Sequence, residues 1–597
     1  MATIVDLDGL SFEYGDGRRA LDDVRMRLAE GEHVAVVGPN GSGKSTLGRI
    51  VAGLEAPLVT GRASVCGHDL SDPRSRRRAR RDVGILFQDP ESQVVGVTVE
   101  EDVAFGLENL GLPTDRIADR VAVMLERFGL EELRLREPHR LSGGQKQRTA
   151  LAGVMAVPRR LMVLDEPTAM LDPEGAAGVL AAVRDLRTDG LTVLSVTQEM
   201  DEVPHADRVM ALKHGRVVFE GTAAELFADE RLLADLSLGA PLSAEVALEL
   251  RRRGHRLESL PLTVDDLVAE LAGLSDGASA GAAAMVGVPA GELEPADDAV
   301  TAAPRAGASA STGMAIDCRD VTFSYEGGST ESPAVAGVSF GSEPGTATAL
   351  LGPSGSGKST LLLLLRGLLE PDGGRVTLDG AAPGTSEHRA LQRQVGIVFQ
   401  RAEAQLFAAT AFDDVAFGPR QWGWSDTAVD EAASEALAAV GLPRDDFGGR
   451  HPYSLSGGEQ RRLALAGVLA MRPRAMLLDE PTVSLDPAGR RDLVAVLRRL
   501  REGGVTMLVA THDVDLAWEL CDRRVVLRGG KLSAAGAWTP AVAAGSRHGE
   551  DGLRRPALVE LWRRLGLLSS PHAVPRSAAA AAAVLAAALT GDLAGRG

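Results

Sequence analysis

Two segments, GPNGSGKST at Gly38–Thr46 and GPSGSGKST at Gly352–Thr360, have the residue types and spacing of a phosphate-binding loop. Each follows an apolar run, HVAVVG or TATALLG, and precedes an apolar helical stretch. Glycines here let backbone N–H groups turn inward around phosphate oxygens, and the following helix adds the positive end of its dipole. A purely structural turn is the alternative, but two full matches in the same context favour nucleotide binding.

Lysine and serine side chains complete each loop. Lys44 and Lys358 supply a positive charge to the β- and γ-phosphates of a nucleotide, and Ser45 and Ser359 offer a hydroxyl to Mg²⁺. The residues expected around the phosphates are Gly38, Pro39, Asn40, Gly41, Ser42, Gly43, Lys44, Ser45 and Thr46 in the first copy, and Gly352, Pro353, Ser354, Gly355, Ser356, Gly357, Lys358, Ser359 and Thr360 in the second.

A pair of adjacent acids ends an apolar run in each half of the chain, as VLDE and LLDE. Asp165 and Asp479 lie at the ends of predicted buried strands, where an acid is costly unless it has a role such as holding Mg²⁺. Glu166 and Glu480 come next and can polarise an attacking water as general bases, an effect worth about 10²–10⁴-fold. A solvated strand end is the alternative for such a pair, and its place downstream of a phosphate-binding loop argues against it.

An internal repeat organises the chain. Lys44 is separated from Lys358 by 314 residues, and the same offset separates Ser142 from Ser456 in a second repeated segment. One ancestral domain was duplicated, with almost no net insertion. Apolar runs such as LMVLD and LTVLSVT alternate with helical stretches, which predicts an α/β fold with a mostly parallel sheet in each copy.

Composition shifts predict the domain boundaries. The 597 residues exceed one hydrophobic core, and an Ala/Gly/Pro-rich stretch without periodicity separates the copies as a flexible linker. The expected organisation is a first domain at 1–222, an appended helical segment at 223–275, the linker at 276–314, a second domain at 315–538 and a C-terminal appendage with an Ala-rich tail at 539–597.

Charge and cysteine usage narrow the function classes. A net charge of −18 argues against a primary role on nucleic acid. Three distant cysteines form no CxxC pair, which favours a reducing compartment over a disulfide framework or a zinc site. Neither a signal peptide nor an apolar run long enough for a bilayer is visible, so we expect a cytosolic chain that a partner can hold at the membrane.

The segments LSGGQ at Leu141 and LSGGE at Leu455 resemble the signature motif of ATP-binding-cassette (ABC) ATPases, and the resemblance covers about residues 7–221 and 318–536. It implies two P-loop NTPase domains, each with a helical subdomain, that bind ATP with Mg²⁺ and hydrolyse it to ADP and phosphate. It also implies that the domains close face to face, so that each signature caps the γ-phosphate held by the other half. The signature residues expected at the nucleotide are Ser142, Gly143, Gly144, Gln145, Ser456, Gly457, Gly458 and Glu459.

Further positions match the family pattern. The resemblance makes Tyr14 and Tyr325 the aromatics that stack on adenine, although strand-end packing is the alternative for both. It makes Asp172 and Asp486 links between the two sites. The full catalytic set that it implies is Glu166, Glu480, His512, Gln198, Gln88 and Gln400, and the Mg²⁺ set is Ser45, Gln88, Asp165, Ser359, Gln400 and Asp479.

The two halves differ at the position of the family's switch histidine. The second copy has His512 in LVATHDVD, whereas the first has Gln198 in LSVTQEMD, and an amide cannot take up a proton. The signatures also differ, with Gln145 against Glu459. We hypothesise that the site on Lys358 carries most of the hydrolysis. The alternative is that the glutamine is a tolerated variant with full activity.

The stretches FQDPESQVVGVTVEEDVAFG and FQRAEAQLFAATAFDDVAFG resemble the ATPase subunits of energy-coupling-factor (ECF) transporters, importers of vitamins such as biotin, riboflavin or a thiamine precursor, and of cobalt or nickel. Gln93 and Gln405 match an extra glutamine of that subfamily, while Arg401–Ala402 departs from its pattern. The resemblance implies a transmembrane coupling protein, a small substrate-capture membrane protein and a peripheral place on the cytoplasmic face. Coupling helices would dock on the helical subdomain after each glutamine.

Other readings stay open. A run of arginines at Arg74–Arg81 could be a lipid or nucleic-acid patch, but a solvated helix face is the simpler interpretation. The chain could also serve another ABC importer or an exporter. A soluble tandem ABC factor of translation or DNA repair is the remaining rival, although the charged helical linker and the zinc-binding cysteines of those groups are absent from this sequence.

Overall fold

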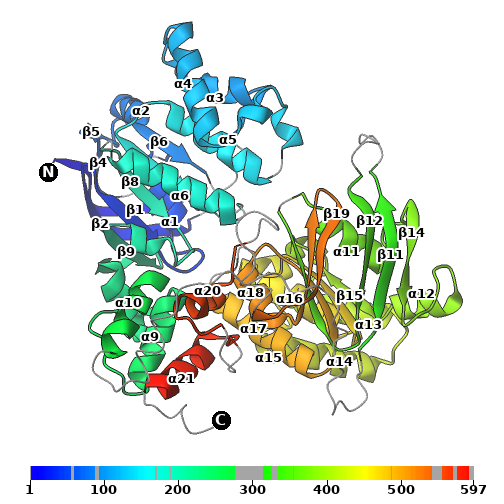
Figure 1. Cartoon of the computed structure of the whole chain (residues 1–597). Coiled ribbons are helices and arrows are strands. Elements are labelled where there is room, and N and C mark those ends of the chain that lie inside the picture. Colours follow the sequence, from blue (N-terminus) through cyan, green and yellow to red (C-terminus); the bar gives the residue numbers. More distant parts are fainter. Residues whose placement is uncertain are drawn as a thin grey trace. The chain divides into compact units, whose positions relative to one another are not determined.

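The computed structural model describes residues 2–15, 17–55, 60–87, 93–141, 143–168, 171, 173–188, 190–275, 313–325, 333–353, 355–483, 485, 487–540, 554–568 and 574–589. These residues form two compact units (Figure 1). Unit 1 comprises residues 1–244 and 260–263, and unit 2 comprises residues 245–259 and 264–597.

Unit 1 contains two sheets. A six-stranded sheet has the order β10-β9-β3-β8-β7-β6, and a four-stranded antiparallel sheet has the order β2-β1-β4-β5. In the larger sheet only the edge strand β10 is antiparallel to its neighbour. The strands are β1 (Thr3–Glu13), β2 (Arg19–Ala29), β3 (His33–Val37), β4 (Thr60–Val65), β5 (His68–Asp69), β6 (Val83–Leu86), β7 (Leu161–Asp165), β8 (Thr192–Val196), β9 (Arg208–Lys213) and β10 (Arg216–Gly221).

Unit 2 repeats this topology in its own strands. Its six-stranded sheet has the order β15-β16-β17-β13-β18-β19, again with only the last pair antiparallel, and a three-stranded sheet has the order β12-β11-β14. The strands are β11 (Ile316–Phe323), β12 (Val335–Ser342), β13 (Ala347–Leu351), β14 (Gly373–Leu378), β15 (Val395–Val398), β16 (Ala475–Asp479), β17 (Thr506–Ala510), β18 (Arg523–Arg528) and β19 (Lys531–Ala537).

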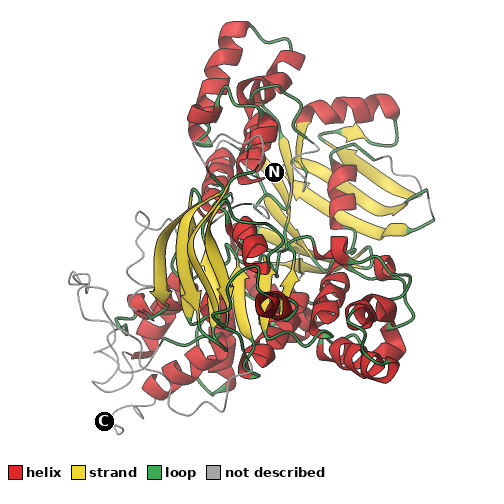
Figure 2. Ribbon diagram, turned by 90° about the vertical axis from the view of Figure 1, so that its right-hand side faces the viewer, coloured by secondary structure: helices red, strands yellow, loops and turns green. Residues whose placement is uncertain are grey.

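The burial of the central strands accounts for their apolar sequences. Every residue of β3, β7 and β8, and of β13, β16 and β17, is buried, because helices cover both faces of a parallel sheet. Such strands appear in the sequence as continuous apolar runs, with an acid only at the exit of β7 and β16. The predicted α/β class with mostly parallel sheets is confirmed. Figure 2 shows the strands in yellow with red helices beside them.

Six helices of each unit correspond in order. Unit 1 contains α1 (Lys44–Val51), α2 (Pro73–Asp82), α3 (Val99–Asn109), α4 (Thr114–Arg127), α5 (Gly143–Ala156), α6 (Pro173–Thr188), α7 (Ala223–Ala228) and α8 (Glu230–Asp235). Unit 2 contains α11 (Lys358–Arg366), α12 (Ser386–Gln392), α13 (Ala411–Gln421), α14 (Asp426–Ala439), α15 (Arg444–Phe447), α16 (Gly457–Leu469), α17 (Pro487–Glu502) and α18 (Val514–Leu520). The corresponding helices are α1 to α6 in unit 1 and α11, α12, α13, α14, α16 and α17 in unit 2.

Helices also form the segments that follow each sheet. After α8 come α9 (Leu242–Arg252) and α10 (Val264–Ser275), most of which belong to unit 2. The C-terminal appendage contains α20 (Ala557–Arg564) and α21 (Ala578–Leu589), so the Ala-rich tail is helical. Helix α10 packs against α20 within unit 2. The linker residues 276–312 lie outside the described residues.

Two further features bear on the predictions. The three cysteines, Cys66, Cys318 and Cys521, are all buried and free. Burial raises the pKa of the Cys66 thiol to about 11 and those of Cys318 and Cys521 to about 12. Among the helices of the described residues, none has the length and apolar character that crossing a bilayer requires.

Candidate nucleotide-binding and catalytic sites

The predicted phosphate-binding loops join β3 to α1 in unit 1 and β13 to α11 in unit 2. Lys44, the first residue of α1, is buried and donates from Nζ to the carbonyl oxygens of Gly38 at 2.7 Å and Pro39 at 2.9 Å. Lys358 donates to Gly352 O at 2.7 Å and Pro353 O at 3.1 Å. Each lysine therefore lies across its own loop, where its charge faces the concave side that phosphates occupy.

The glycines of these loops are required by close backbone approach. Gly43 has φ of +101°, and a Cβ atom at this position would lie 2.4 Å from the carbonyl oxygen of Ala20. Gly357 has φ of +98°, and a Cβ atom there would lie 2.3 Å from the carbonyl oxygen of Ala334. The left-handed conformation turns the chain into the helix, so backbone N–H groups of the first helical turn are available to an anion.

The predicted Mg²⁺ ligands lie together at the end of β7 and of β16. Ser45 Oγ donates to Asp165 Oδ1 at 3.1 Å. Burial raises the pKa of Asp165 to about 6, although the hydrogen bond from Ser45 acts in the opposite direction. Burial likewise raises the pKa of Asp479, whose Oδ1 is buried without a hydrogen-bond partner among the described residues. Desolvated carboxylates beside a hydroxyl are the donor set of a hard cation, so these residues fit Mg²⁺.

No group of three or more His, Cys, Asp or Glu side chains within the described ranges could hold a metal alone. A Mg²⁺ ion here would thus take its remaining ligands from water and phosphate oxygens, as it does in phosphoryl-transfer sites.

Glu166 and Glu480 follow these aspartates in a strained backbone conformation. Their φ angles are +50° and +45°, which is uncommon for a residue with a side chain. Each backbone N–H donates at 2.8 Å to the last residue of the neighbouring strand, Glu166 to Val196 O and Glu480 to Ala510 O. The sheet therefore fixes the turn that points each carboxylate away from the strand direction. This strain could not be predicted from the sequence.

The switch positions make different contacts in the two units. In unit 2, Nδ1 of His512 lies 3.0 Å from Oε2 of Glu480. Burial opposes protonation of His512, but the hydrogen bond and charge of Glu480 outweigh it and raise the pKa of the imidazole. In unit 1, Gln198 donates from Nε2 to Glu166 Oε1 at 2.5 Å and to Asn40 Oδ1 at 2.9 Å. Both predicted switch residues thus reach the predicted general base, one as a titratable group and one as an amide.

The second signature forms a helix cap at the start of α16. Ser456 and Glu459 make a reciprocal capping box, in which Ser456 Oγ accepts from Glu459 N at 3.4 Å and Glu459 Oε2 accepts from Ser456 N at 2.8 Å. The Ser456 hydroxyl also donates to Glu459 Oε2 at 2.7 Å. Gly457 and Gly458 occupy the first turn of α16, as Gly143, Gly144 and Gln145 do in α5. The predicted residues that lie outside the described residues are Ser142, Gln88, Ser354, Asp172 and Asp486.

Both predicted adenine-stacking tyrosines point their hydroxyl at the phosphate-binding loop. Tyr14 Oη lies 2.8 Å from Thr46 Oγ1, and Tyr325 Oη lies 3.2 Å from Thr360 Oγ1. Phe12 packs edge-to-face against Tyr14 with 5.0 Å between ring centroids, and the equivalent pair in unit 2 has the same geometry. Each tyrosine therefore packs at the end of a strand and also lies beside the phosphate-binding loop.

The glutamines near β6 and β15 have two roles. Gln400 follows β15 and is exposed, while its carbonyl oxygen accepts from Arg461. Gln93 and Gln405 instead close the loop back on its own strand: Phe87 N donates to Gln93 Oε1 at 3.1 Å, and Phe399 N donates to Gln405 Oε1 at 3.1 Å. The extra glutamines thus stabilise the loop.

Sequence reasoning missed two groups of residues. Arg461, on the buried face of α16, donates to the carbonyl oxygens of Gln400, Glu480 and Pro481, so one side chain joins two loops of the site, the one at Gln400 and the one at Glu480–Pro481. Its counterpart Gln147 donates to Pro167 O at 2.8 Å. Neither was distinguished in the sequence, because both lie within a run of polar residues, QKQR in the first copy and EQRR in the second.

The second missed group consists of carboxylates that hold the loop before α3 and α13. Asp102 Oδ1 accepts from the backbone of Val95 at 2.7 Å and Gly96 at 2.8 Å. Asp414 does the same for the backbone of Phe407 and Ala408. The sequence signal was an aspartate at the same place in the two EDVAFG and DDVAFG segments.

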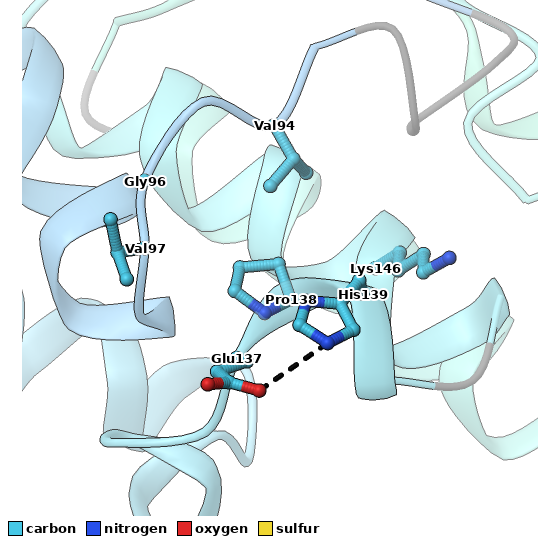
Figure 3. Close-up of a pocket in the computed structure, with 7 residues that line it drawn as sticks. All are labelled: Val94, Gly96, Val97, Glu137, Pro138, His139 and Lys146. Carbon is cyan, nitrogen blue, oxygen red and sulfur yellow. Dashed lines mark ion pairs between the residues drawn. The ribbon is translucent and has the colours of Figure 1, made fainter.

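A surface pocket adjoins this loop in unit 1 (Figure 3). Its lining contains Val94, Gly96, Val97, Glu137, Pro138, His139 and Lys146. The imidazole of His139 lies 3.3 Å from the carboxylate of Glu137. Val95, Val97 and Leu135, at or beside this pocket, are 61%, 72% and 76% exposed, so this face presents aliphatic side chains to solvent.

The matching surface of unit 2 is aromatic. Phe407 and Tyr453 are 61% and 59% exposed, and Phe417 packs edge-to-face against Phe407 at 4.7 Å between centroids. In the sequence repeat, Tyr453 takes the place of His139 and His451 that of Glu137. The two surfaces therefore differ in chemistry although their backbones correspond.

The arginine run forms α2, and Asp72 caps this helix by accepting from Ser75 N at 2.7 Å. Arg76 and Arg80 turn back to the carbonyl oxygens of Leu70 and Gly53, and the other arginines of the helix are exposed. The exposed positions agree with the interpretation as a solvated helix face.

Comparison with known proteins gives a consistent result. The family model described as "ABC transporter" matches residues 21–169 and 335–483, once in each half. A "Putative ABC transporter ATP-binding protein" of Bifidobacterium longum is 35% identical over 87% of this chain, which spans 64% of that protein. A protein of the same description from Caldanaerobacter subterraneus is 32% identical, over 93% of this chain and 95% of the relative. The "Putative HMP/thiamine import ATP-binding protein YkoD" of Bacillus subtilis is 30% identical over 88% of this chain and 90% of its own length.

Proposed function

Because the chain belongs to the family of ABC transporter ATP-binding proteins, which bind and hydrolyse ATP, we propose that it energises import through an ECF-type membrane complex. The cargo is a vitamin, such as thiamine or its precursor, or a cobalt or nickel ion. The observation that carries this proposal is the likeness, over most of both chains, to a relative named for HMP/thiamine import. The chain would act on the cytoplasmic face of the membrane, bound to its partners.

The chemistry assigned to each site follows from its own residues. Lys44 and Lys358 bind and orient the β- and γ-phosphates. Glu166 and Glu480 hold the attacking water and accept its proton, while Ser45 with Asp165, and Ser359 with Asp479, would hold Mg²⁺. When bound, the ion neutralises charge that develops on the phosphoryl oxygens. The positive φ angles of Glu166 and Glu480 fix the position of each general base before the substrate binds.

We further infer that the two halves close on ATP, with Ser456 facing the nucleotide on Lys44 and Ser142 facing the nucleotide on Lys358. This arrangement rests on the family pattern. The double variant Ser142→Arg and Ser456→Arg should abolish turnover of ATP while leaving ATP binding to each loop measurable. Normal turnover in that variant would contradict the arrangement.

The site on Lys358 is proposed to carry most of the hydrolysis. In this site His512 contacts Glu480, and the signature residue from the other half is the neutral Gln145. In the site on Lys44, Gln198 contacts Glu166, and the signature residue from the other half is Glu459. A second carboxylate near a γ-phosphate opposes binding by charge repulsion. We expect Glu480→Gln to remove most of the ATP turnover and Glu166→Gln a minor part. Equal losses would contradict this asymmetry.

The exposed surfaces around Val97 and Tyr453 are the proposed docking sites of a transmembrane coupling protein. Their different chemistry suits two non-equivalent helices of the partner. Val97→Asp and Tyr453→Asp should each weaken co-purification with the membrane complex while ATP binding stays intact. As a control, Glu108→Gln on the exposed face of α3 should change neither property.

The membrane partners themselves provide the direct test. Purification of the tagged chain in mild detergent should recover a coupling protein and a small membrane protein that binds a vitamin or a cobalt or nickel ion. Reconstituted vesicles should then take up that cargo only with ATP and intact Glu480. Recovery of an exporter, of another importer, or of ribosomal RNA in place of these partners would contradict the proposal.

A further inference from the structure

The segment after the switch residue differs between the two units. In unit 2, α18 begins at Val514, directly after Asp513, whose side chain accepts from the backbone of Asp515 at 3.1 Å and Leu516 at 3.0 Å. Asp513 also pairs with Arg490 of α17 at 2.6 Å. In unit 1 the same place holds only a 3₁₀ turn at Val203–His205. His512 is therefore continuous with a helix, and Gln198 is not.

The C-terminal appendage binds the first turn of α18. The Asp515 carboxylate forms an ion pair with Arg554, and its Oδ1 accepts from the backbone N–H of Ala557 at 2.6 Å. Ala557 is the first residue of α20, so Asp515 also meets the positive end of that helix. A side chain three residues after His512 thus joins the switch segment to the appendage.

The far turn of α18 is held by a second contact. Trp518, 2% exposed, donates from Nε1 to Pro575 O at 3.0 Å. The guanidinium of Arg576 lies over the Trp518 ring at 4.1 Å and donates to Cys521 O at 2.7 Å. Trp538, which follows β19, closes the cluster with its ring centroid 5.8 Å from that of Trp518. Both ends of the helix are therefore attached to the described parts of the appendage.

The same appendage contacts the helices that follow the first domain. Arg564 of α20 forms an ion pair with Asp265 of α10, and α20 packs on α10 while Trp562 is fully buried. Figure 1 shows α10 and α20 as neighbours. The C-terminal appendage thus contacts both α10, which follows the first copy, and α18, which follows the switch residue of the second copy.

We propose that the C-terminal appendage positions His512 by holding α18, and that Asp515 is the positioning residue through which it does so. This inference rests on the proposed role of His512 in ATP hydrolysis. A helix of seven residues is not stable by propensity alone, so its place depends on tertiary contacts. The contact between His512 and Glu480 spans 3.0 Å, and a displacement of about 1 Å in a catalytic group can cost about 10²-fold in rate.

The test is a double-variant cycle on the full chain in its membrane complex. Asp515→Ala and Arg554→Ala should each lower kcat by roughly tenfold with the KM for ATP within about twofold, because binding groups stay in place. Arg554→Lys, which keeps the charge, should restore part of kcat. In a His512→Ala background neither alanine variant should lower kcat further, since a positioning residue acts only through the group that it positions. Arg563→Ala, whose ion pair lies inside α20, is the matched control and should behave as wild type.

Each outcome decides the inference. Equal losses from Asp515→Ala with and without His512 would overturn it, and so would a His512→Ala variant with normal turnover. Glu480→Gln separates the two proposals: normal turnover in that variant would contradict the proposed catalysis itself. If Asp515→Ala lowers the Tm enough to prevent assay, Trp518→Phe replaces it and should likewise lower kcat only when His512 is present, because it keeps an aromatic ring under Arg576 but removes the donor to Pro575 and part of the buried ring.

Discussion

The hydroxyl of Ser456 donates a hydrogen bond to the carboxylate of Glu459 at 2.7 Å, so the serine of the second signature is engaged by a negative charge of its own helix. The backbone N–H of Ser456 donates to the same oxygen at 2.8 Å. A γ-phosphate that approaches this serine must compete with a carboxylate and meet its charge. The first signature has Gln145 at the equivalent position, which carries no charge.

Replacement of that carboxylate should therefore improve the site on Lys44. We expect Glu459→Gln to lower the Kd for ATP of this site by roughly three- to tenfold, since one nearby repulsion of about 1 kcal/mol disappears. Titration of a Glu480→Gln chain with a fluorescent ATP analogue measures the change. Glu435→Gln, an exposed carboxylate on α14, is the control, and an unchanged Kd for Glu459→Gln would contradict the proposed closure of the halves.

Exchange of the switch residues should change the two sites unequally. His512→Gln gives unit 2 the amide of unit 1 and should reduce ATP turnover about tenfold or more, because the group on Glu480 can then no longer take up a proton. Gln198→His should raise turnover by at most about twofold, as a second site of comparable rate would do. Steady-state phosphate release measures both. A larger loss in Gln198→His than in His512→Gln would refute the assignment.

A methyl group at Gly43 should disable the first loop. The added Cβ would lie 2.4 Å from Ala20 O and the residue has φ of +101°, so Gly43→Ala must shift the loop and should abolish ATP binding to unit 1. Gly41→Ala is the matched control, because it also has a positive φ, of +74°, but no atom within 4 Å of the new carbon. We expect a strong loss in the first variant and a mild one in the second, measured by equilibrium binding of ATP to a Lys358→Ala chain.

Glu202 should make the stability of unit 1 depend on pH. Burial raises its pKa from 4.5 to about 7, although Thr168 and Thr197 donate hydrogen bonds that lower it. The folded state then holds the proton more tightly than the unfolded state, so the free energy of unfolding falls as pH rises between these two values. At pH values above the folded pKa, the buried carboxylate lowers the free energy of unfolding by its full amount, on the order of 3 kcal/mol.

The neutral isostere Glu202→Gln should remove that cost. We expect its Tm to exceed the wild-type Tm at about pH 8 and to match or fall below it at about pH 5, where the wild-type carboxyl is protonated in the folded state. Unit 2 has Leu516 at the equivalent position of the repeat, and this side chain is fully buried and uncharged. A constant Tm difference across pH would contradict the buried proton.

The sequence could predict the elements whose cause is local. The runs HVAVV and LMVLD predict buried parallel strands because their side chains are apolar except for the first histidine of one run and the final acid of the other. The loop ending at Lys44 is predicted from the spacing of its glycines, of which Gly38 and Gly43 have backbone conformations that other residues rarely adopt. These features required no knowledge of distant contacts.

The remaining features depend on partners far along the chain. The positive φ of Glu166 is imposed by the neighbouring strand at Val196. Arg461 reaches Gln400, which lies 61 residues earlier, and nothing near Arg461 in the sequence indicates that contact. The packing of α10 on α20 joins the segment after the first copy to the segment after the second, and a periodic pattern shows only that each helix has an apolar face.

The buried thiols of Cys66, Cys318 and Cys521 have a practical consequence. With their pKa values raised to about 11 and 12, they are almost entirely uncharged at neutral pH, and the sequence has no other cysteine. The native thiols should therefore react slowly with maleimides, so an introduced cysteine can be labelled selectively. One cysteine introduced at an exposed site in each repeat can carry a donor and an acceptor dye, and their energy transfer would follow the approach of the halves in real time.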